Sequence, residues 1–271
     1  MHFHETVIKL SDGYIAEALS LLQKESLDEA AVHDIRVLMK RLRGLLRLYV
    51  PAGKRDIVKQ LNPVLRDVAR SFAAQRDSHV LLETLQQVEG RATRTVARQL
   101  RQIVRELDQL TAAVSPELSA EKMAEDLVWV RALWHEELAG LDEATLQDSL
   151  ARSYRRNRKQ GRESLKLRDK EVLHDWRKRV KYLYYQMCAL PAGDDNFSAE
   201  MERMRKLGSI LGKVHDLDIL TVYLLAQGYE NEHIMRLISK RRVRLVKKIR
   251  RLYRKLFFRT TKEFRRKIAS L

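Results

Sequence analysis

Apolar residues recur every three or four positions along most of the chain, which is the spacing of one face of an α-helix. No stretch alternates apolar and polar residues as a half-buried β-strand would. Capping residues, prolines and glycines divide the pattern into helices, one of which is expected to bend at Pro63. The expected helices cover residues 11–24, 28–50, 54–77, 78–88, 91–113, 119–139, 142–168, 170–190, 198–213, 215–227 and 230–258. The pattern therefore predicts an all-α protein, with a frayed end at 260–271.

Composition supports the helical prediction and narrows the cellular setting. The 271 residues include only four prolines and ten glycines, and this length fits one large domain or two small ones. The single cysteine, Cys188, excludes an internal disulfide and a Cys-rich metal site. No apolar run approaches the roughly 18 residues of a membrane span, and no secretion signal is visible. We therefore expect a cytoplasmic protein.

One motif, H-D-x-R-x-x-x-K, occurs twice in the chain, at residues 33–40 and again at 174–181. Its spacing puts the histidine, the arginine and the lysine on one stripe of a helix. Two helices with the same cationic stripe predict a ligand with a row of negative charges.

The two parts of the chain also match beyond this motif. Residues 65–81 resemble residues 204–220, and both segments follow their motif helix at a comparable distance. Two motifs in the same order at nearly the same offset predict an internal duplication, with two helical bundles related by a pseudo-twofold axis. We expect one domain with halves at about 5–115 and 140–258, followed by a basic tail at 259–271.

The first motif helix has a cationic side and an apolar side. At about 100° per residue, one narrow sector holds His33, Arg36, Lys40, Arg43 and Arg47. Leucine, isoleucine and tyrosine residues fall roughly opposite and must face the core. Four full cations without an acid repel one another, so we expect an anion to neutralise them. A solvated basic surface is the alternative.

The second motif helix repeats this plan less completely. It keeps His174, Arg177 and Lys181, with Lys178 beside them. We expect the preceding helix to supply the missing charge from one face. That face carries Tyr154, Arg155, Arg158, Arg162 and Lys166. Each motif histidine has two open roles, a phosphate contact or a structural hydrogen bond.

Positive charge dominates the whole chain, with 53 Lys or Arg against 36 Asp or Glu and a net charge of +17. Such an excess indicates a partner that is a nucleic acid, an acidic membrane surface or another polyanion. Residues 236–267 hold sixteen Lys or Arg and one acid, Glu263, in an amphipathic pattern. This segment has four open interpretations: a wall of the same anion groove, a solvated face, a nucleic-acid arm, or a helix on a membrane surface.

Several strings in this sequence resemble one known family. H-x-x-R-x-x-x-K-R-x-R at 33–43 and L-H-D-W-R-K-x-V-K-Y at 173–182 are similar to the two hallmark helices of the CHAD family, the conserved-histidine α-helical domain. R-D-x-x-V-L-L at 76–82, L-G-x-x-x-D-L-D-I-L at 211–220 and Y-R-R at 154–156 also resemble that family.

The resemblance to the CHAD family covers about residues 5–258. It implies two four-helix subdomains in pseudo-twofold arrangement, with basic residues around a central groove or pore. It also implies binding of inorganic polyphosphate. Such domains are often fused to a triphosphate tunnel domain, whose E-x-E-x-K signature is absent from this sequence. We therefore expect a stand-alone protein that associates with polyphosphate granules.

The cationic stripes and the resemblance together define the expected polyphosphate-binding residues. They are His33, Arg36, Lys40, Arg43, Arg47, Arg66, Arg70, Arg76, Tyr154, Arg155, Arg158, Arg162, His174, Arg177, Lys178, Lys181, Tyr182, Arg205, Lys206, Lys213 and His215. Three residues make the predicted binding surfaces of the two halves unequal. Tyr184 and Cys188 thin the second stripe, and Arg76 stands where the second half has His215.

Signals for catalysis are weak in this sequence. No nucleophile elbow, P-loop or Gly-rich dinucleotide turn is present, and the histidines do not cluster at metal spacing. The H-D-L-D string at 215–218 could chelate a metal, but we favour helix capping or pairing with arginines for its aspartates. We expect no catalysis, cofactor or resident metal. The alternatives are a nucleic-acid-binding protein that uses the basic C-terminal helix and a metal-dependent enzyme acting on phosphate anhydrides.

Overall fold

The computed structural model describes residues 2–24, 26–90, 97–98, 100–105, 118–167, 169–191, 195–229 and 231–271. Regular secondary structure in these ranges is entirely helical, which confirms the predicted all-α class. The helices are α1 (Phe3–Leu22), α2 (Glu29–Leu46), α3 (Arg55–Arg70), α4 (Ala73–Glu89), α6 (Ala120–Leu138), α7 (Glu143–Leu167), α8 (Lys170–Met187), α9 (Asp195–Ala226), α10 (Glu232–Leu256) and α11 (Thr261–Ala269). The helix predicted at 91–113 lies largely outside the described residues. Within the described ranges, no helix has the length and apolar character needed to cross a membrane.

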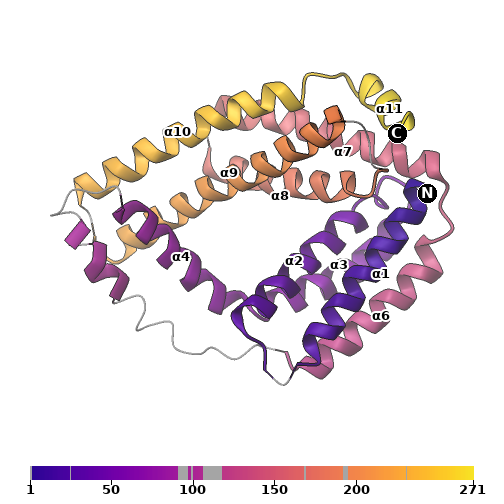
Figure 1. The fold of residues 1–271 in the computed structure, drawn as a ribbon, viewed down its shortest axis with the longest axis horizontal. Coiled ribbons are helices and arrows are strands. Elements are labelled where there is room, and N and C mark those ends of the chain that lie inside the picture. Colours follow the sequence, from indigo (N-terminus) through magenta and orange to yellow (C-terminus); the bar gives the residue numbers. More distant parts are fainter. Residues whose placement is uncertain are drawn as a thin grey trace.

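Most of the described helices form two groups that meet where α2 packs on α8 (Figure 1). In the first group α1 packs on α2 and α6, and α3 packs on the same two helices. In the second group α8 packs on α7 and α9, and α9 packs on α10. One large hydrophobic core runs through both groups, while α4 reaches across to pack on α9. The duplication and its pseudo-twofold axis stay predictions.

The contact between α2 and α8 is close because a glycine lies at the crossing. A Cβ built on Gly44 of α2 would lie 3.1 Å from the Cβ of Tyr185 on α8. The buried Gln186 side chain donates from Nε2 to the carbonyl oxygen of Gly44 at 2.9 Å. This close approach brings the polar faces of the two motif helices beside one another.

Helix α1 begins earlier than the sequence pattern predicts, at Phe3 rather than near Ser11. His2 and Glu5 form a capping box at its first turn. The carboxylate of Glu143 on α7 also accepts from the backbone N–H groups of Phe3 and His4. These partners satisfy donors that a helix start leaves open, so the helix extends to the beginning of the described chain.

Helix α9 is one element, and the prediction of two helices at 198–213 and 215–227 is wrong. No proline interrupts the segment, and its apolar residues keep helical register through the expected break. Val214, Leu217 and Leu220 are all buried on the same side as the residues before them. An unbroken apolar stripe of this kind stabilises a continuous helix.

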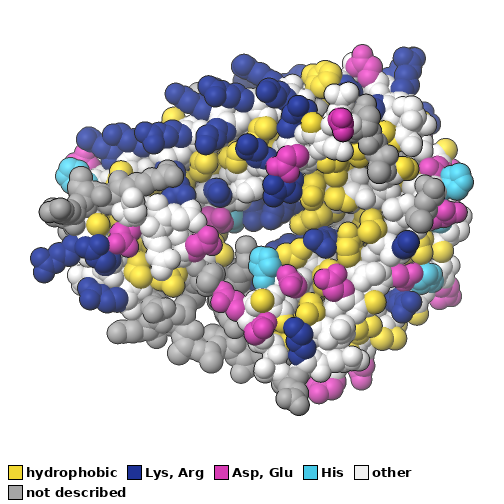
Figure 2. Space-filling view, in the orientation of Figure 1, with side chains coloured by type: hydrophobic (Ala, Val, Ile, Leu, Met, Phe, Trp, Pro, Cys, Tyr) yellow, Lys and Arg dark blue, Asp and Glu magenta, His cyan; other side chains and the backbone are white. Residues whose placement is uncertain are grey.

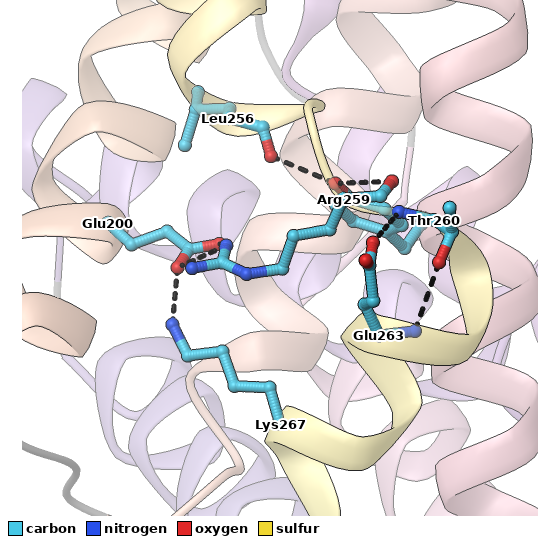
Figure 3. A network of polar contacts seen from close by, with 7 residues as sticks. Glu200, Leu256, Arg259, Thr260, Glu263 and Lys267 are labelled. Carbon is cyan, nitrogen blue, oxygen red and sulfur yellow. Dashed lines mark hydrogen bonds and ion pairs between the residues drawn. The ribbon is translucent and has the colours of Figure 1, made fainter.

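The end of the chain is helical, so the prediction of a frayed segment at 260–271 is wrong. Thr260 and Glu263 form a capping box at the start of α11 (Figure 3). Phe264 is buried. The carboxylate of Glu200 on α9, only 3% exposed, pairs with Arg259 at 3.1 Å and also with Lys267. These contacts tie the last helix to the second group.

Candidate anion-binding groove

A groove of about 690 Å³ lies where the two helical groups meet. Helices α2 and α3 contribute one wall, and α7 and α8 contribute the other. The lining residues are Arg36, Lys40, Arg43, Arg47, Val50, Arg66, Ala69, Arg70, Ser153, Arg156, Asn157, Asp175, Arg177, Lys178, Arg179, Lys181, Tyr182, Leu183, Tyr185 and Gln186. Figure 2 shows Lys and Arg side chains in the hollow between the upper and lower parts of the molecule.

The lining of the groove is strongly positive. Among the described residues that line it, eleven are Lys or Arg and one, Asp175, is acidic. Asp175 is engaged by its neighbour Lys178, at 3.1 Å from Nζ to Oδ1. Cations on facing walls repel one another, and the attraction of such a cleft for an anion grows because its walls exclude water.

The α2 wall carries the cationic row that helical spacing predicts, and two of its members also have structural roles. Arg36 is 8% exposed and donates from Nη1 to the carbonyl oxygen of Phe72, between α3 and α4. Arg43 donates from Nε to Oδ1 of Asn62 on α3 at 3.0 Å. These bonds hold the row in place, and Arg47 at the end of α2 is its exposed member.

Crowding of like charges is visible in the ionisation of this wall. Burial lowers the pKa of Arg43, and the neighbouring charges of Arg47, Arg66 and Arg70 lower it further against the opposing effect of Tyr182. An anion in the groove would relieve this repulsion, because an opposite charge favours the charged form of each arginine.

The two walls touch through an aromatic contact. The guanidinium of Arg47 on α2 lies over the ring of Tyr182 on α8, with its Cζ atom 4.6 Å from the ring centroid. A cation over a ring face is attracted by the negative face of the π system. The contact joins the two walls, and Arg47 remains exposed at the groove.

The α7 wall differs from the predicted one. The residues of α7 that line the groove are Ser153, Arg156 and Asn157. Tyr154, one residue away, is fully buried, stacks on Phe264 at 4.0 Å between ring centroids, and donates to the carbonyl oxygen of Leu256. Burial raises the pKa of Tyr154 to about 12.

Tyr154 thus sets the rotation of α7, and the predicted basic face turns away from the groove. Arg158 donates from Nη1 to the carbonyl oxygen of Arg259 at 2.7 Å. Arg155 and Arg162 are exposed, and neither lines the groove. Arg156 and Arg179 are groove residues that the sequence reasoning missed. The Y-R-R string at 154–156 could have identified Arg156, if Tyr154 had been assigned to the core rather than to the basic face.

Other expected residues divide between the groove and the rest of the surface. Arg66 and Arg70 line the groove from α3. On α9, Arg205 pairs with Glu202 at 2.7 Å, and Lys206 and Lys213 are exposed outside the groove lining. The side chain of Arg76 on α4 lies outside the described residues. Tyr184 and Cys188, the two residues that thin the second cationic stripe, line a separate cavity of about 360 Å³ together with Arg205.

The motif histidines lie outside the groove lining. His33 is exposed at the first turns of α2. His174 on α8 faces His215 on α9, with 3.0 Å between their Nδ1 atoms and 4.0 Å between ring centroids. Burial lowers the pKa of His174, and the charges of Lys178 and Arg177 lower it further. A phosphate contact for these histidines stays a prediction, while the ring pair joins α8 to α9.

A metal-binding cluster is not formed among the described residues, where no three His, Cys, Asp or Glu side chains are grouped suitably. Within the H-D-L-D string, Asp218 is engaged by Arg242 of α10, with 2.7 Å from Nε to Oδ1. For Asp218, this contact is the pairing with an arginine that was one of the two expected roles of the aspartates.

The basic helix α10 is separate from the groove. None of its residues belongs to the groove lining, and it packs on α9. The backbone of α7 receives hydrogen bonds from α10, through Tyr253 to the carbonyl oxygen of Arg158 and through Arg250 to that of Leu165. Helix α7 therefore contacts α10 with one side and lines the groove with another.

Comparison with known protein families gives one match. The family model described as the CHAD domain matches residues 13–225, which is more than three quarters of the chain. The match includes both motif helices and all of the residues that line the groove, and it ends before α10. No curated protein matches the chain.

Proposed function

The chain belongs to the CHAD family, and we propose that its groove binds inorganic polyphosphate without hydrolysing it. The observation that carries this proposal is the convergence of eleven Lys or Arg side chains, with one acid, on the groove that the described residues form between the two helical groups. Both motif helices contribute to these walls.

Polyphosphate suits the chemistry of the groove. It is a flexible linear anion with about one charge per phosphate. Its units are identical, so a protein can bind it without base-specific contacts. Arginine forks bind two oxygens of a phosphate group, whereas a lysine acts as a mobile point charge. The α2 row from Arg36 to Arg47 extends about 16 Å at 1.5 Å per residue, so it follows several groups of such a chain.

The same lining supports the proposal that binding occurs without hydrolysis. General acid–base catalysis needs a proton donor or acceptor held beside the reacting bond, and two carboxylates with different pKa values often supply both. The groove has one carboxylate in its described lining, Asp175, and Lys178 engages it. We expect no release of orthophosphate when the protein is incubated with polyphosphate and Mg²⁺ or Mn²⁺. Turnover that depends on the groove residues would support the enzyme alternative instead.

A titration with matched variants tests binding. The groove variant replaces Lys40, Arg47 and Lys181 by Gln, which spares Arg36 because of its bond to the backbone of Phe72. Each lost cation removes a charge-assisted contact of about 1.5–3 kcal/mol, so affinity for long-chain polyphosphate should fall at least about 100-fold. Wild-type binding should also weaken steeply as salt rises, because counterions are released on binding.

The matched control removes the same charge elsewhere. It replaces Lys9, Lys24 and Arg55, which are exposed on or beside α1 and α3 outside the groove lining, by Gln. We expect a change below about 3-fold, since distant exposed charges are screened. Equal losses in the two variants would reduce the effect to net charge and would contradict a specific groove.

Location in the cell is part of the proposal. We propose a cytoplasmic protein that is held on polyphosphate granules by the groove. A fluorescent fusion should concentrate on the granules, and the groove variant should spread through the cytoplasm. Retention of the groove variant on the granules would contradict this.

A further inference from the structure

Helix α10 presents a second basic surface that the proposed function does not use. Its apolar side is buried, with Ile234, Ile238, Ile249 and Leu256 at most 3% exposed. Its outer side is a row of exposed cations, which we call the α10 row (Figure 2). The α10 row consists of Arg236, Lys240, Arg244, Lys247, Lys248, Arg251, Arg254 and Lys255.

The α10 row is distinct from the arginines that hold the helix in place. Arg242 pairs with the buried Asp218, Arg250 donates to the backbone of α7, and Arg241 bonds to Gln87 of α4. These three contacts fix α10 on the molecule. The α10 row lies beside these anchoring contacts, and its members are exposed.

Charge in the α10 row is almost unneutralised. Arg236 pairs with Glu232 at 3.3 Å, and this is the one ion pair that the row makes with described residues. The other members are exposed and make no hydrogen bond or ion pair with the described part of the chain. Like charges at three- and four-residue spacing repel, so the row gains from a bound polyanion.

Geometry favours a duplex over a single strand or a membrane. A single strand is held largely by bases stacked on aromatic rings, and the one aromatic residue within the row's span, Tyr253, packs against Trp176. A surface helix enters a membrane through its apolar side, which α10 buries against its own protein. The row from Arg236 to Lys255 extends about 28 Å. This is comparable with one turn of duplex DNA, about 34 Å.

We infer that the outer face of α10 is a second polyanion site, which binds the phosphate backbone of double-stranded nucleic acid independently of the groove. Contacts of this kind fix a protein on a duplex without reading its sequence. The site lies beyond the residues that the family model matches.

The test uses the full chain and three variants that each lose three positive charges. The α10 variant replaces Lys240, Lys247 and Arg251 by Gln, within about 40° of one another on the helix. The groove variant and the control variant defined above complete the set. Binding of a mixed-sequence DNA duplex and of long-chain polyphosphate is measured at several salt concentrations.

We expect the α10 variant to bind the duplex at least about 10-fold more weakly, with the slope of log affinity against log salt reduced by about 3. Its polyphosphate affinity should stay within about 3-fold of wild type, because the groove keeps its cations. The groove variant should show the reverse, with polyphosphate binding lost and duplex binding kept. Equal helical circular dichroism in all variants shows that each one folds.

Several results would overturn the inference. Duplex binding that survives in the α10 variant, or that is lost in the groove variant, would mean that the α10 row is not the site. An equal loss in the control variant would mean that only net charge matters. Binding of anionic phosphatidylserine vesicles through the α10 row, without binding of the duplex, would identify the surface as a membrane contact instead.

Discussion

Arg36 shows how a single residue can belong to both the binding surface and the fold. It lines the groove, yet it is 8% exposed and donates to the carbonyl oxygen of Phe72. Helical spacing alone predicts that Arg36, Lys40 and Arg47 share one side of α2. It does not predict that one of them is anchored, because Phe72 is distant in sequence and its position depends on where α3 ends.

Replacing Arg36 by Gln should therefore lower stability as well as binding. A hydrogen bond from a charged donor contributes about 1.5–3 kcal/mol, so urea unfolding should show a loss of about that size. Arg47→Gln is the control, because Arg47 is exposed and loss of its contact with the ring of Tyr182 should cost less than about 1 kcal/mol. Equal stability of the two variants would mean that the contact with Phe72 contributes nothing.

His174 has an ionisation that reports its role. Burial and two nearby cations lower its pKa below 6.5, so the folded protein binds this proton less tightly than the unfolded chain does. Its neutral form therefore supports full stability above about pH 6.5, and stability is lost as pH falls through the lowered pKa. Between pH 7.5 and 5.5, His174→Gln should lose less of its unfolding free energy than wild type does.

A matched variant and a ligand separate the two roles that the sequence leaves open for His174. His233→Gln is the matched variant, because it removes an exposed imidazole of α10 outside the His174–His215 pair. A phosphate group beside His174 would raise its pKa, because an opposite charge favours the protonated form. NMR titration of His174 with saturating polyphosphate compares the two roles: an unchanged, lowered pKa supports the structural hydrogen bond, and a rise larger than neutralisation of Arg177 and Lys178 explains supports a phosphate contact.

At the scale of helices, the groove depends on how closely α2 and α8 approach. Gly44 and Gln186 define the crossing, and neither is charged, so a search for cationic patterns passes over both. The rotation of α7 is also set from a distance, by the stacking of Tyr154 on Phe264 near the end of the chain. Local periodicity predicts that these segments are helical, but not which face each turns to the groove.

Gly44→Leu should separate the two motif helices. The added side chain meets Tyr185, whose Cβ already lies 3.1 Å from the position of a Cβ at residue 44. Such overpacking costs about 1–3 kcal/mol, which should lower the melting temperature and weaken polyphosphate binding together. Gly13→Leu is the control, because nothing lies within 4 Å of a Cβ at that position. Unchanged binding by Gly44→Leu would show that this crossing does not shape the site.

The contacts around Glu200 show why the chain end is helical rather than frayed (Figure 3). Glu200→Gln should leave Arg259 and Lys267 without their buried negative partner. Breaking a buried ion pair costs about 3–5 kcal/mol, so a large drop in unfolding free energy should follow. The exposed pair of Glu232 with Arg236 offers the comparison, and Glu232→Gln should cost less than about 1 kcal/mol. Similar losses in both variants would argue against a stabilising role for the buried network.

Across the described part of the molecule, two surfaces carry rows of positive charge that a polyanion could follow. One is the groove between the helical groups, and the other is the outer face of α10. The apolar pattern and the composition predicted the all-α class, and the motif strings carried the resemblance to the family, because each of these signals lies within single helices. The sequence alone could not predict that the two basic surfaces are separate. Their separation depends on tertiary packing, which places the groove on one side of α7 and α10 on another.

The central claim is that one linear polyanion lies between α2 and α8. Crystals of the full chain with a short polyphosphate test it directly. We expect phosphate groups in the groove, with contacts from Lys40 and Arg47 on one wall and Lys181 on the other. Phosphates bound only along α10, or around His174 and His215 with the groove unoccupied, would contradict it.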